Sequence, residues 1–234
     1  MYHSITFGGK NTWDDWHLIP KTRPVVNPPQ VKTQIVDIPG GDGVIDLTAA
    51  LTGRPCYRNR TGTWTFIAEN GFKAWHQLYS EVMAHLHGRT LRATLEDDPA
   101  YYYEGRFTVN AWNSEAYYST IEIGYDVKPY KMWDICDGSK WLWDPFNFET
   151  GIIYDYDDMV VDGVLEVKVI GSRMPYVPRI KVNGDGMQVS HMGKRYDLSR
   201  GLNVIADILL MEGENLLTFT GTGRVSIEYA GGVL

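Results

Sequence analysis

Cysteine is scarce in this chain, and long apolar runs are absent. Cys56 and Cys136 are the only cysteines among 234 residues, and neither belongs to a Cys-x-x-Cys pair. Free thiols are therefore expected, with a single disulfide between the two as the alternative. No apolar run reaches the roughly 18–20 residues of a membrane-spanning helix, and Met1 to Ile5 lacks the basic-then-apolar order of a signal peptide. We expect a protein that is made in the cytoplasm and does not enter a membrane.

Positive charge is also limited. The chain has 22 Lys and Arg residues against 29 Asp and Glu, a formal net charge of −7. Up to Trp133 the count is 13 basic against 14 acidic residues, and after it 9 against 15. Proteins that bind phosphate backbones present a dense basic face. Sequence-specific nucleic-acid binding is therefore not expected, and the acidic excess belongs mainly to the second part of the chain.

Signatures of catalysis and of metal binding are missing. The sequence has no HExxH, GxSxG, GxxxxGK[ST] or GxGxxG motif. The carboxylates at 96–98 fall in a predicted loop, and adjacency does not supply the facing pair of a glycosidase. Asp155, Asp157 and Asp158 lack the Gly and the final Glu of a calcium loop. We predict no catalytic residue, metal site or cofactor; a hydrolase would rest on scattered carboxylates alone.

One segment has helical periodicity. Its apolar side chains recur every three or four positions and would share one helix face. They are Phe72, Trp75, Tyr79, Val82, Met83 and Leu86. Asn70 is a suitable N-cap and Gly88 a suitable left-handed stop. The pattern predicts one amphipathic helix over about residues 71–87, packed against a sheet.

Most of the remaining chain alternates apolar and polar residues over short runs, which is typical of strands. In the first part, strands are predicted at 91–95, 101–112 and 118–125, with a loop at 96–99. The later strands are predicted at 164–169, 180–182, 187–189, 202–205, 207–210, 216–220 and 225–229. A turn is predicted at 221–223, between the last two strands.

A tryptophan-rich stretch without regular period begins at Trp133. We place a domain boundary there, which gives domains 1–133 and 134–234. About seven short strands with regular turns predict an antiparallel β-sandwich for the second domain. The fold class is therefore mainly β, with one helix in the first domain.

Aromatic residues are abundant, with 8 Trp and 15 Tyr. Trp and Tyr rings can stack on sugars, so Trp141, Trp143 and Tyr154 form a candidate glycan platform. On that interpretation the chain is a carbohydrate-binding module that mediates adhesion to a host. The other interpretation, which we favour, is that the aromatic residues fill cores and protein interfaces.

Several turn-and-strand motifs, taken in their order and spacing, resemble one family. The motifs are MYHSITFGGKNTW at 1–13, VDIPGGDGVIDLT at 36–48, LTGRP at 51–55, RTGTW at 60–64, GKRYDL at 193–198, GLN at 201–203, GENL at 213–216 and GRVSI at 223–227. Together they are similar to the distal tail protein (Dit) family of long, flexible-tailed bacteriophages and their prophages. The resemblance spans nearly the whole chain, and the segment at 36–48 is its most specific part.

This resemblance implies a structural role in a virion. Family members combine an N-terminal, β-barrel-like domain carrying one helix with a peripheral, galectin-like β-sandwich. The first domain assembles into a hexameric ring at the tail tip, which leaves a channel for DNA. The ring joins the tail tube protein to the tail-tip and host-recognition proteins. The resemblance thus implies a homo-hexamer with no enzymatic activity.

A cyclic ring is built from contacts between two different surfaces of the same protomer. Open edges of β domains suit such contacts. The segment from Gly40 to Leu47 joins a glycine-rich turn to an amphipathic strand. We therefore name Asp42, Gly43, Ile45 and Leu47 as candidate ring-interface residues. The alternative is that this segment forms a conventional intramolecular hairpin.

Overall fold

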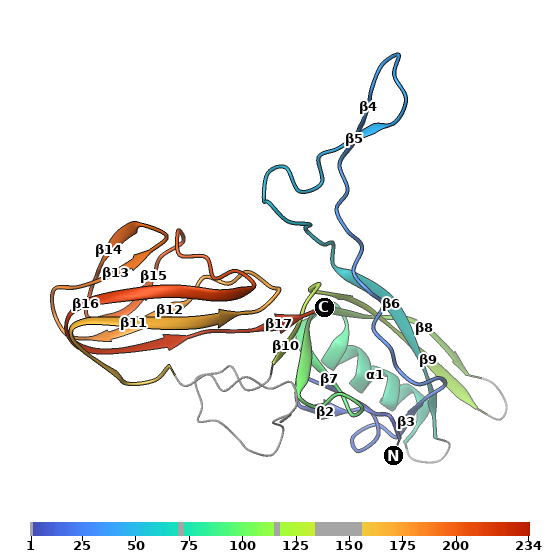
Figure 1. The fold of residues 1–234 in the computed structure, drawn as a ribbon. Coiled ribbons are helices and arrows are strands. Elements are labelled where there is room, and N and C mark those ends of the chain that lie inside the picture. Colours follow the sequence, from blue (N-terminus) through green and yellow to red (C-terminus); the bar gives the residue numbers. More distant parts are fainter. Residues whose placement is uncertain (1, 70–72, 115–117, 134–155) are drawn as a thin grey trace. The chain divides into compact units, whose positions relative to one another are not determined.

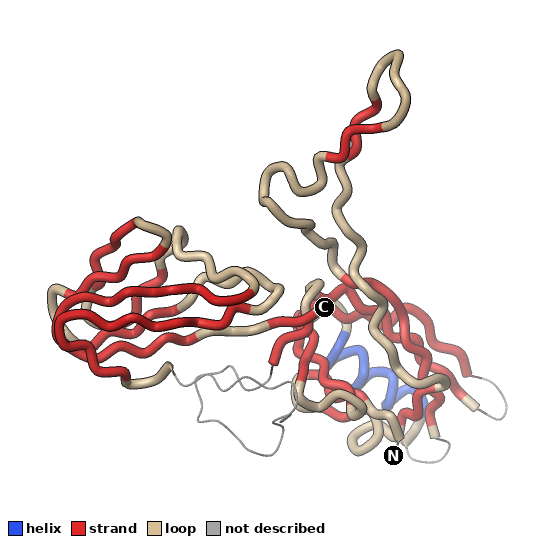
Figure 2. The backbone as a smooth tube through the Cα atoms, viewed as in Figure 1, coloured by secondary structure: helices blue, strands red, loops and turns tan. Residues whose placement is uncertain are grey.

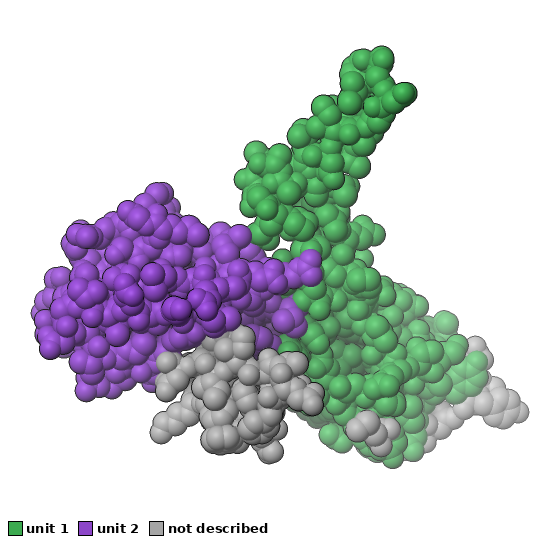
Figure 3. Space-filling view, viewed as in Figure 1, with its two compact units in different colours: residues 1–131, 234 green, residues 132–233 purple. Residues whose placement is uncertain are grey.

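The computed structural model describes residues 2–69, 73–114, 118–133 and 156–234. Within these ranges the chain consists of antiparallel strands and a single helix, which confirms the mainly β fold class (Figures 1 and 2). It divides into two compact units, Met1–Lys131 with Leu234 and Met132–Val233 (Figure 3). Each unit has its own hydrophobic core. The roles expected for domains 1–133 and 134–234 stay predictions.

An antiparallel sheet organises the first unit, with strands in the order β2–β1–β7–β8–β9–β6–β3. The strands are β1 (Ile5–Phe7), β2 (Lys10–Asn11), β3 (Leu18–Pro20), β6 (Arg60–Ala68), β7 (Thr90–Leu95), β8 (Tyr101–Ser114) and β9 (Ser119–Val127). Strand β9 pairs with β6 along its full length and with β8 on its other side. The strands predicted at 91–95, 101–112 and 118–125 are confirmed as β7, β8 and β9.

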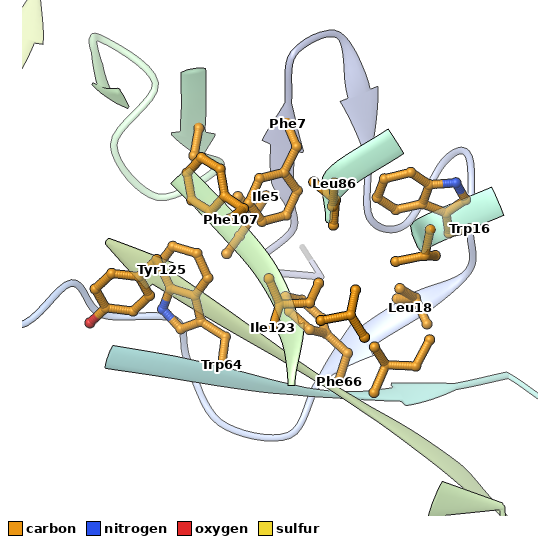
Figure 4. Close-up of a cluster of buried hydrophobic side chains, with 14 of the residues drawn as sticks. Ile5, Phe7, Trp16, Leu18, Trp64, Phe66, Leu86, Phe107, Ile123 and Tyr125 are labelled. Atoms are coloured by element: carbon orange, nitrogen blue, oxygen red, sulfur yellow. The ribbon is translucent and has the colours of Figure 1, made fainter. Parts of the chain in front are cut away.

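The core of this unit combines aliphatic side chains with several large aromatic rings (Figure 4). Alternation along β6 sends Trp64 and Phe66 inward, as the pleat of a strand requires. The rings of Phe7 and Phe107 meet edge to face with centroids 5.0 Å apart, and Trp64 stacks on Tyr125 at 4.3 Å. Offset and edge-to-face pairs of this kind add to the stabilisation that burial provides.

The helix α1 (Trp75–Leu86) lies within the predicted range of 71–87. Its apolar row packs into the same core. The row consists of Leu78, Val82 and Leu86, with Trp75, Tyr79 and Met83 partly buried beside them. The spacing pattern omitted Leu78, which lies four positions before Val82 and so shares its face. Gly88 has φ +73 and is the predicted left-handed stop. The N-cap is Ala74, which has no capping side chain, so the prediction of Asn70 as N-cap is wrong. Asn70 and Phe72 lie outside the described residues.

The second unit contains a six-stranded antiparallel sheet in the order β14–β13–β16–β12–β15, with β11 paired to β16. The strands are β11 (Met159–Gly171), β12 (Arg179–Asn183), β13 (Met187–His191), β14 (Lys194–Leu198), β15 (Gly201–Val204) and β16 (Gly213–Glu228). Two short strands, β10 (Lys131–Trp133) and β17 (Gly232–Val233), pair with each other. Phe219 and Ile180 are fully buried in the core of this unit.

The turn predicted at 221–223 is wrong, because β16 runs through it as one strand. Residues 218–220 pair with β13, and residues 224–228 pair with β12, so β16 passes from one partner strand to another. Gly221 has φ +124 there, and a Cβ on Gly223 would lie 2.7 Å from the backbone oxygen of Asn183. The glycines thus permit a bend and a close approach instead of ending the strand.

The strand predicted at 207–210 is also wrong. Leu210 forms only an isolated bridge to Tyr176, and the segment is otherwise irregular. Ile208 and Leu210 are nevertheless fully buried. The apolar residues in this segment are therefore explained by burial in the core, although the segment is not a strand.

Two asparagines hold the loops before β15 and β16 with the same hydrogen bonds. The Oδ1 of Asn215 accepts from the backbone N–H of Met211 at 2.9 Å, and its Nδ2 donates to the Met211 carbonyl at 2.7 Å. In the same way, the Oδ1 of Asn203 accepts from the backbone N–H of Ser199 at 2.9 Å, and its Nδ2 donates to the Ser199 carbonyl at 2.7 Å. Asn215 is buried, whereas Asn203 is half-buried.

We expect Asn215→Ala to lower the free energy of unfolding of the second unit by about 2–3 kcal/mol, because a buried donor and acceptors lose their partners. Asn203→Ala is the matched control, and its cost should be about 1 kcal/mol, since water can reach that loop. Urea unfolding of the two variants measures the difference. Equal losses would contradict the role given to burial.

Candidate functional site

A two-stranded hairpin within the first unit is the most unusual surface of the described chain. Strands β4 (Ile35–Asp37) and β5 (Val44–Asp46) pair antiparallel with each other and form a sheet of their own. Figure 1 shows them at the end of an arm that stands clear of the main sheet of the same unit. Gly40 and Gly43 have φ +75 and +84, which the turn between the strands requires.

One face of this hairpin is apolar. Val36 lies directly opposite Ile45 in the register, and Ile38 and Leu47 follow two positions further along each arm. Alternation places all four side chains on the same side of the ribbon. All four are exposed, Val36 by 45% and Ile45 by 49% of their surface. We call Val36, Ile38, Ile45 and Leu47 the apolar face.

The opposite side of the hairpin mixes carboxylates with apolar groups. Ile35 lies opposite Asp46, and Asp37 lies opposite Val44. We call these four residues the acidic face. The Oδ1 of Asp46 accepts the backbone N–H of Thr48 at 2.8 Å, and the hydrogen bonds from Thr48 lower the pKa of Asp46.

An isolated two-stranded ribbon is at best marginally stable in water. A contiguous exposed apolar surface on a folded protein usually marks an interaction site. Both rules apply to this hairpin, because neither face of β4 and β5 is covered by another part of the described chain. The geometry therefore suits a hairpin that is completed by a partner.

The hairpin is joined to the main sheet by a neck in which the two arms pair. Val31 bridges to Tyr57, and the backbone N–H of Lys32 donates to the Cys56 carbonyl at 2.8 Å. The N–H of Arg58 donates to the carbonyl of Gln30 at 2.7 Å. Beside the neck is an open hollow of about 620 Å³. It is lined by Asn27, Pro28, Gln30, Lys32, Tyr57, Arg58, Asn59 and Thr61, and we call it the neck hollow.

The base of the neck is fixed to the aromatic core. Arg60 is buried and its Nε donates to the Pro129 carbonyl at 2.7 Å. Burial lowers the pKa of Arg60. Trp64 Nε1 donates to the Val25 carbonyl at 3.0 Å, and the backbone N–H of Asn27 donates to the Tyr125 hydroxyl at 3.0 Å. These hydrogen bonds anchor the start of the arm to the first unit.

The candidate ring-interface residues all lie in this hairpin. Asp42 and Gly43 belong to its turn, and Ile45 and Leu47 belong to its apolar face. The segment does pair with β4 of the same chain, as the alternative interpretation held. Its place in a ring stays a prediction. Sequence reasoning missed Val36 and Ile38, although both are apolar and lie just before the glycine-rich turn.

Other predicted groups lie elsewhere. Trp141, Trp143 and Tyr154 of the candidate glycan platform are outside the described residues, as are Cys136 and Asp155. Cys56 is a free, half-buried thiol. Among the described residues no cluster of three or more His, Cys, Asp or Glu side chains is placed to hold a metal ion. No helix in the described ranges is long and apolar enough to span a membrane.

The carboxylates at 96–98 are engaged by neighbouring side chains. Asp97 accepts from Arg23 Nε at 2.9 Å and lies 2.8 Å from His3 Nδ1, and the hydrogen bond from Arg23 is the main cause that lowers the pKa of Asp97. Glu96 accepts from the backbone N–H of Ser4 at 2.7 Å, which lowers the pKa of Glu96. These contacts tie the N-terminal segment to the turn between β7 and β8, so the cluster has a structural explanation.

The comparisons with known proteins bear on the fold. No protein-family model matches the sequence, and no curated protein sequence is detectably similar to it. The structure matches the crystal structure of the Dit protein (gp 19.1) of phage SPP1 with a TM-score of 0.65, over 99% of this chain and 99% of that chain. The chain has the Dit fold. Sequence identity to SPP1 Dit is only 11%.

The SPP1 Dit protein is described as a paradigm of the hub adsorption apparatus in phages that infect Gram-positive bacteria. The match covers both units, and it confirms at the level of fold the resemblance to the Dit family given by the sequence motifs. At 11% identity few side chains are shared, so the likeness is one of fold.

Proposed function

We propose that this chain is a structural component of a phage tail, a distal tail protein that forms the hub between tail tube and tail tip. The observation that carries the proposal is the match to SPP1 Dit over 99% of both chains. A match of this extent includes both units and leaves no large inserted domain in either protein. The proposed location is the tail tip of a virion.

The proposed assembly is a homo-hexameric ring. A cyclic ring repeats one heterologous contact, in which two different surfaces of the protomer meet. The apolar face of the hairpin supports this assembly, because Val36 and Ile45 are half exposed and would be covered by a neighbouring copy. On this proposal the tail tube protein contacts one side of the ring and a tail-tip protein the other. The galectin-like second unit would lie at the periphery.

Negative-stain electron microscopy of the purified full chain tests the proposal. We expect ring-shaped particles with sixfold symmetry and a central opening. Single copies at every concentration that can be imaged would contradict it. Addition of a soluble tail tube protein from the same phage should stack a second ring on one side only, since the two sides of a cyclic ring differ.

A further inference from the structure

Opposite charges are separated along the arm of the first unit. From residue 33 to residue 53 the chain has three acidic residues, Asp37, Asp42 and Asp46, and no Lys or Arg. The neck hollow has the reverse composition, with Lys32 and Arg58 and no acidic residue in its lining. The remaining lining includes amide and hydroxyl side chains, which can also bond a carboxylate.

These charged groups have no partners inside the described part of the chain. Asp37, Asp42, Lys32 and Arg58 take part in none of its ion pairs, and all four are exposed. Asp46 bonds only its own loop, at Thr48. The hairpin therefore presents carboxylates that are free to pair, and the neck presents free cations.

The two sets are not paired with each other within the molecule. Asp37 is five residues beyond Lys32 on an extended arm, which corresponds to roughly 16 Å at about 3.3 Å per residue. Exposed charges at that separation are largely screened, because the Debye length at physiological salt is about 8 Å. Pairing of Asp37 or Asp42 with a neck hollow therefore requires a second molecule.

We infer that the neck hollow of one copy receives the acidic face and turn of the hairpin of the next copy. This inference rests on the proposed ring and names the surface that would receive the hairpin. Each copy then uses its hairpin once and its neck hollow once, which is the heterologous contact that closes a ring. The two faces of the ribbon have different roles: the acidic face pairs with Lys32 and Arg58, and the apolar face packs on the body of the neighbour.

Charge reversal tests this directly. The neck variant carries Lys32→Glu and Arg58→Glu, and the hairpin variant carries Asp37→Lys and Asp42→Lys. None of these side chains makes a bond within the described chain, so both variants should fold as the wild type does, as circular dichroism and melting temperature will show. Each variant alone should self-associate roughly 100-fold more weakly in sedimentation velocity, because like charges then face each other.

Complementation separates direct contact from a general effect of charge. In an equimolar mixture the basic hairpin meets the acidic neck, and the acidic hairpin meets the basic neck, so the mixture should assemble with both variants in every particle. A single chain with all four substitutions should also assemble by itself. Lys194→Glu with Arg195→Glu, two exposed positions on β14, is the control with the same change of net charge as the neck variant, and it should assemble as the wild type does.

The outcomes are distinct. Two results would show that the neck hollow is not the receiving surface, without contradicting the ring. One is that the neck and hairpin variants each assemble as strongly as the wild type. The other is that neither the mixture nor the four-substitution chain assembles. A wild-type chain that is monomeric at all concentrations would overturn the ring together with this inference. Loss of assembly in each variant and its recovery in the mixture would establish the contact.

Discussion

Ile45→Asp is expected to abolish self-association while leaving the monomer folded. Ile45 is half exposed in the single chain and lies at the centre of the apolar face, directly opposite Val36. In the proposed ring, a carboxylate there would be buried without a partner in each contact, at a cost of about 3–5 kcal/mol. That is more than roughly 100-fold in the dissociation constant of each contact. Sedimentation velocity measures the loss, and circular dichroism checks the fold.

Val164→Asp is the matched control for this substitution. Val164 is a strand residue of the second unit and is 65% exposed, so the chemical change and the loss of apolar surface are comparable. The control should retain the mass of the wild type. Leu47→Asp, on the same face as Ile45, should reproduce the loss. If Ile45→Asp and Leu47→Asp both keep the wild-type mass, the apolar face is not part of the assembly.

Phe107→Ala and Phe219→Ala should each remove about 3–5 kcal/mol from the free energy of unfolding, and each from a different unit. Both side chains are fully buried. The ring centroid of Phe107 lies 5.0 Å from that of Phe7 and 6.4 Å from that of Trp64. Phe219 lies in the separate core of the second unit. Because the cores are separate, the loss in one unit should not be transmitted to the other.

Hydrogen exchange read out by mass spectrometry distinguishes the two units in one sample. Phe107→Ala should increase exchange in β6, β8 and β9 and leave β11 and β16 unchanged, and Phe219→Ala should do the reverse. Equal increases in both units after either substitution would mean that the chain unfolds as one cooperative block. The two-domain organisation would then be wrong in energetic terms.

Local patterns in the sequence were sufficient for much of the fold. The alternation at 91–95, 101–112 and 118–125 corresponds to β7, β8 and β9, since a strand with one buried face needs a period of two. The helix was found because its apolar row repeats every three or four residues and Gly88 ends it with a positive φ. In these elements the period of the buried residues follows from the local backbone geometry, so it can be recognised within a single segment.

Features that depend on distant partners were missed. Gly221 and Gly223 resemble a turn in isolation, but their neighbours in space are β11, β13 and Asn183, which keep the chain extended. Ile208 and Leu210 are apolar and fully buried, but Leu210 forms only an isolated bridge to Tyr176. Burial can be inferred from a single segment, whereas strand pairing cannot.

The candidate site was found only in part for the same reason. The glycine-rich turn and the amphipathic strand pointed to Ile45 and Leu47. The contribution of Val36 depends on the cross-strand register, which places it opposite Ile45. The neck hollow joins Lys32 and Arg58 across two arms separated by the whole hairpin, so no local pattern could have assembled it.

The mass of the purified full chain in solution is the most direct test of the ring. Multi-angle light scattering at micromolar concentration should give about 160 kDa for a closed assembly of six copies of the 26.6 kDa chain, with no larger species because the contacts close on themselves. The wild type should keep this mass on dilution while Ile45→Asp runs as a single chain. A wild-type mass near 26.6 kDa at every concentration would contradict the account.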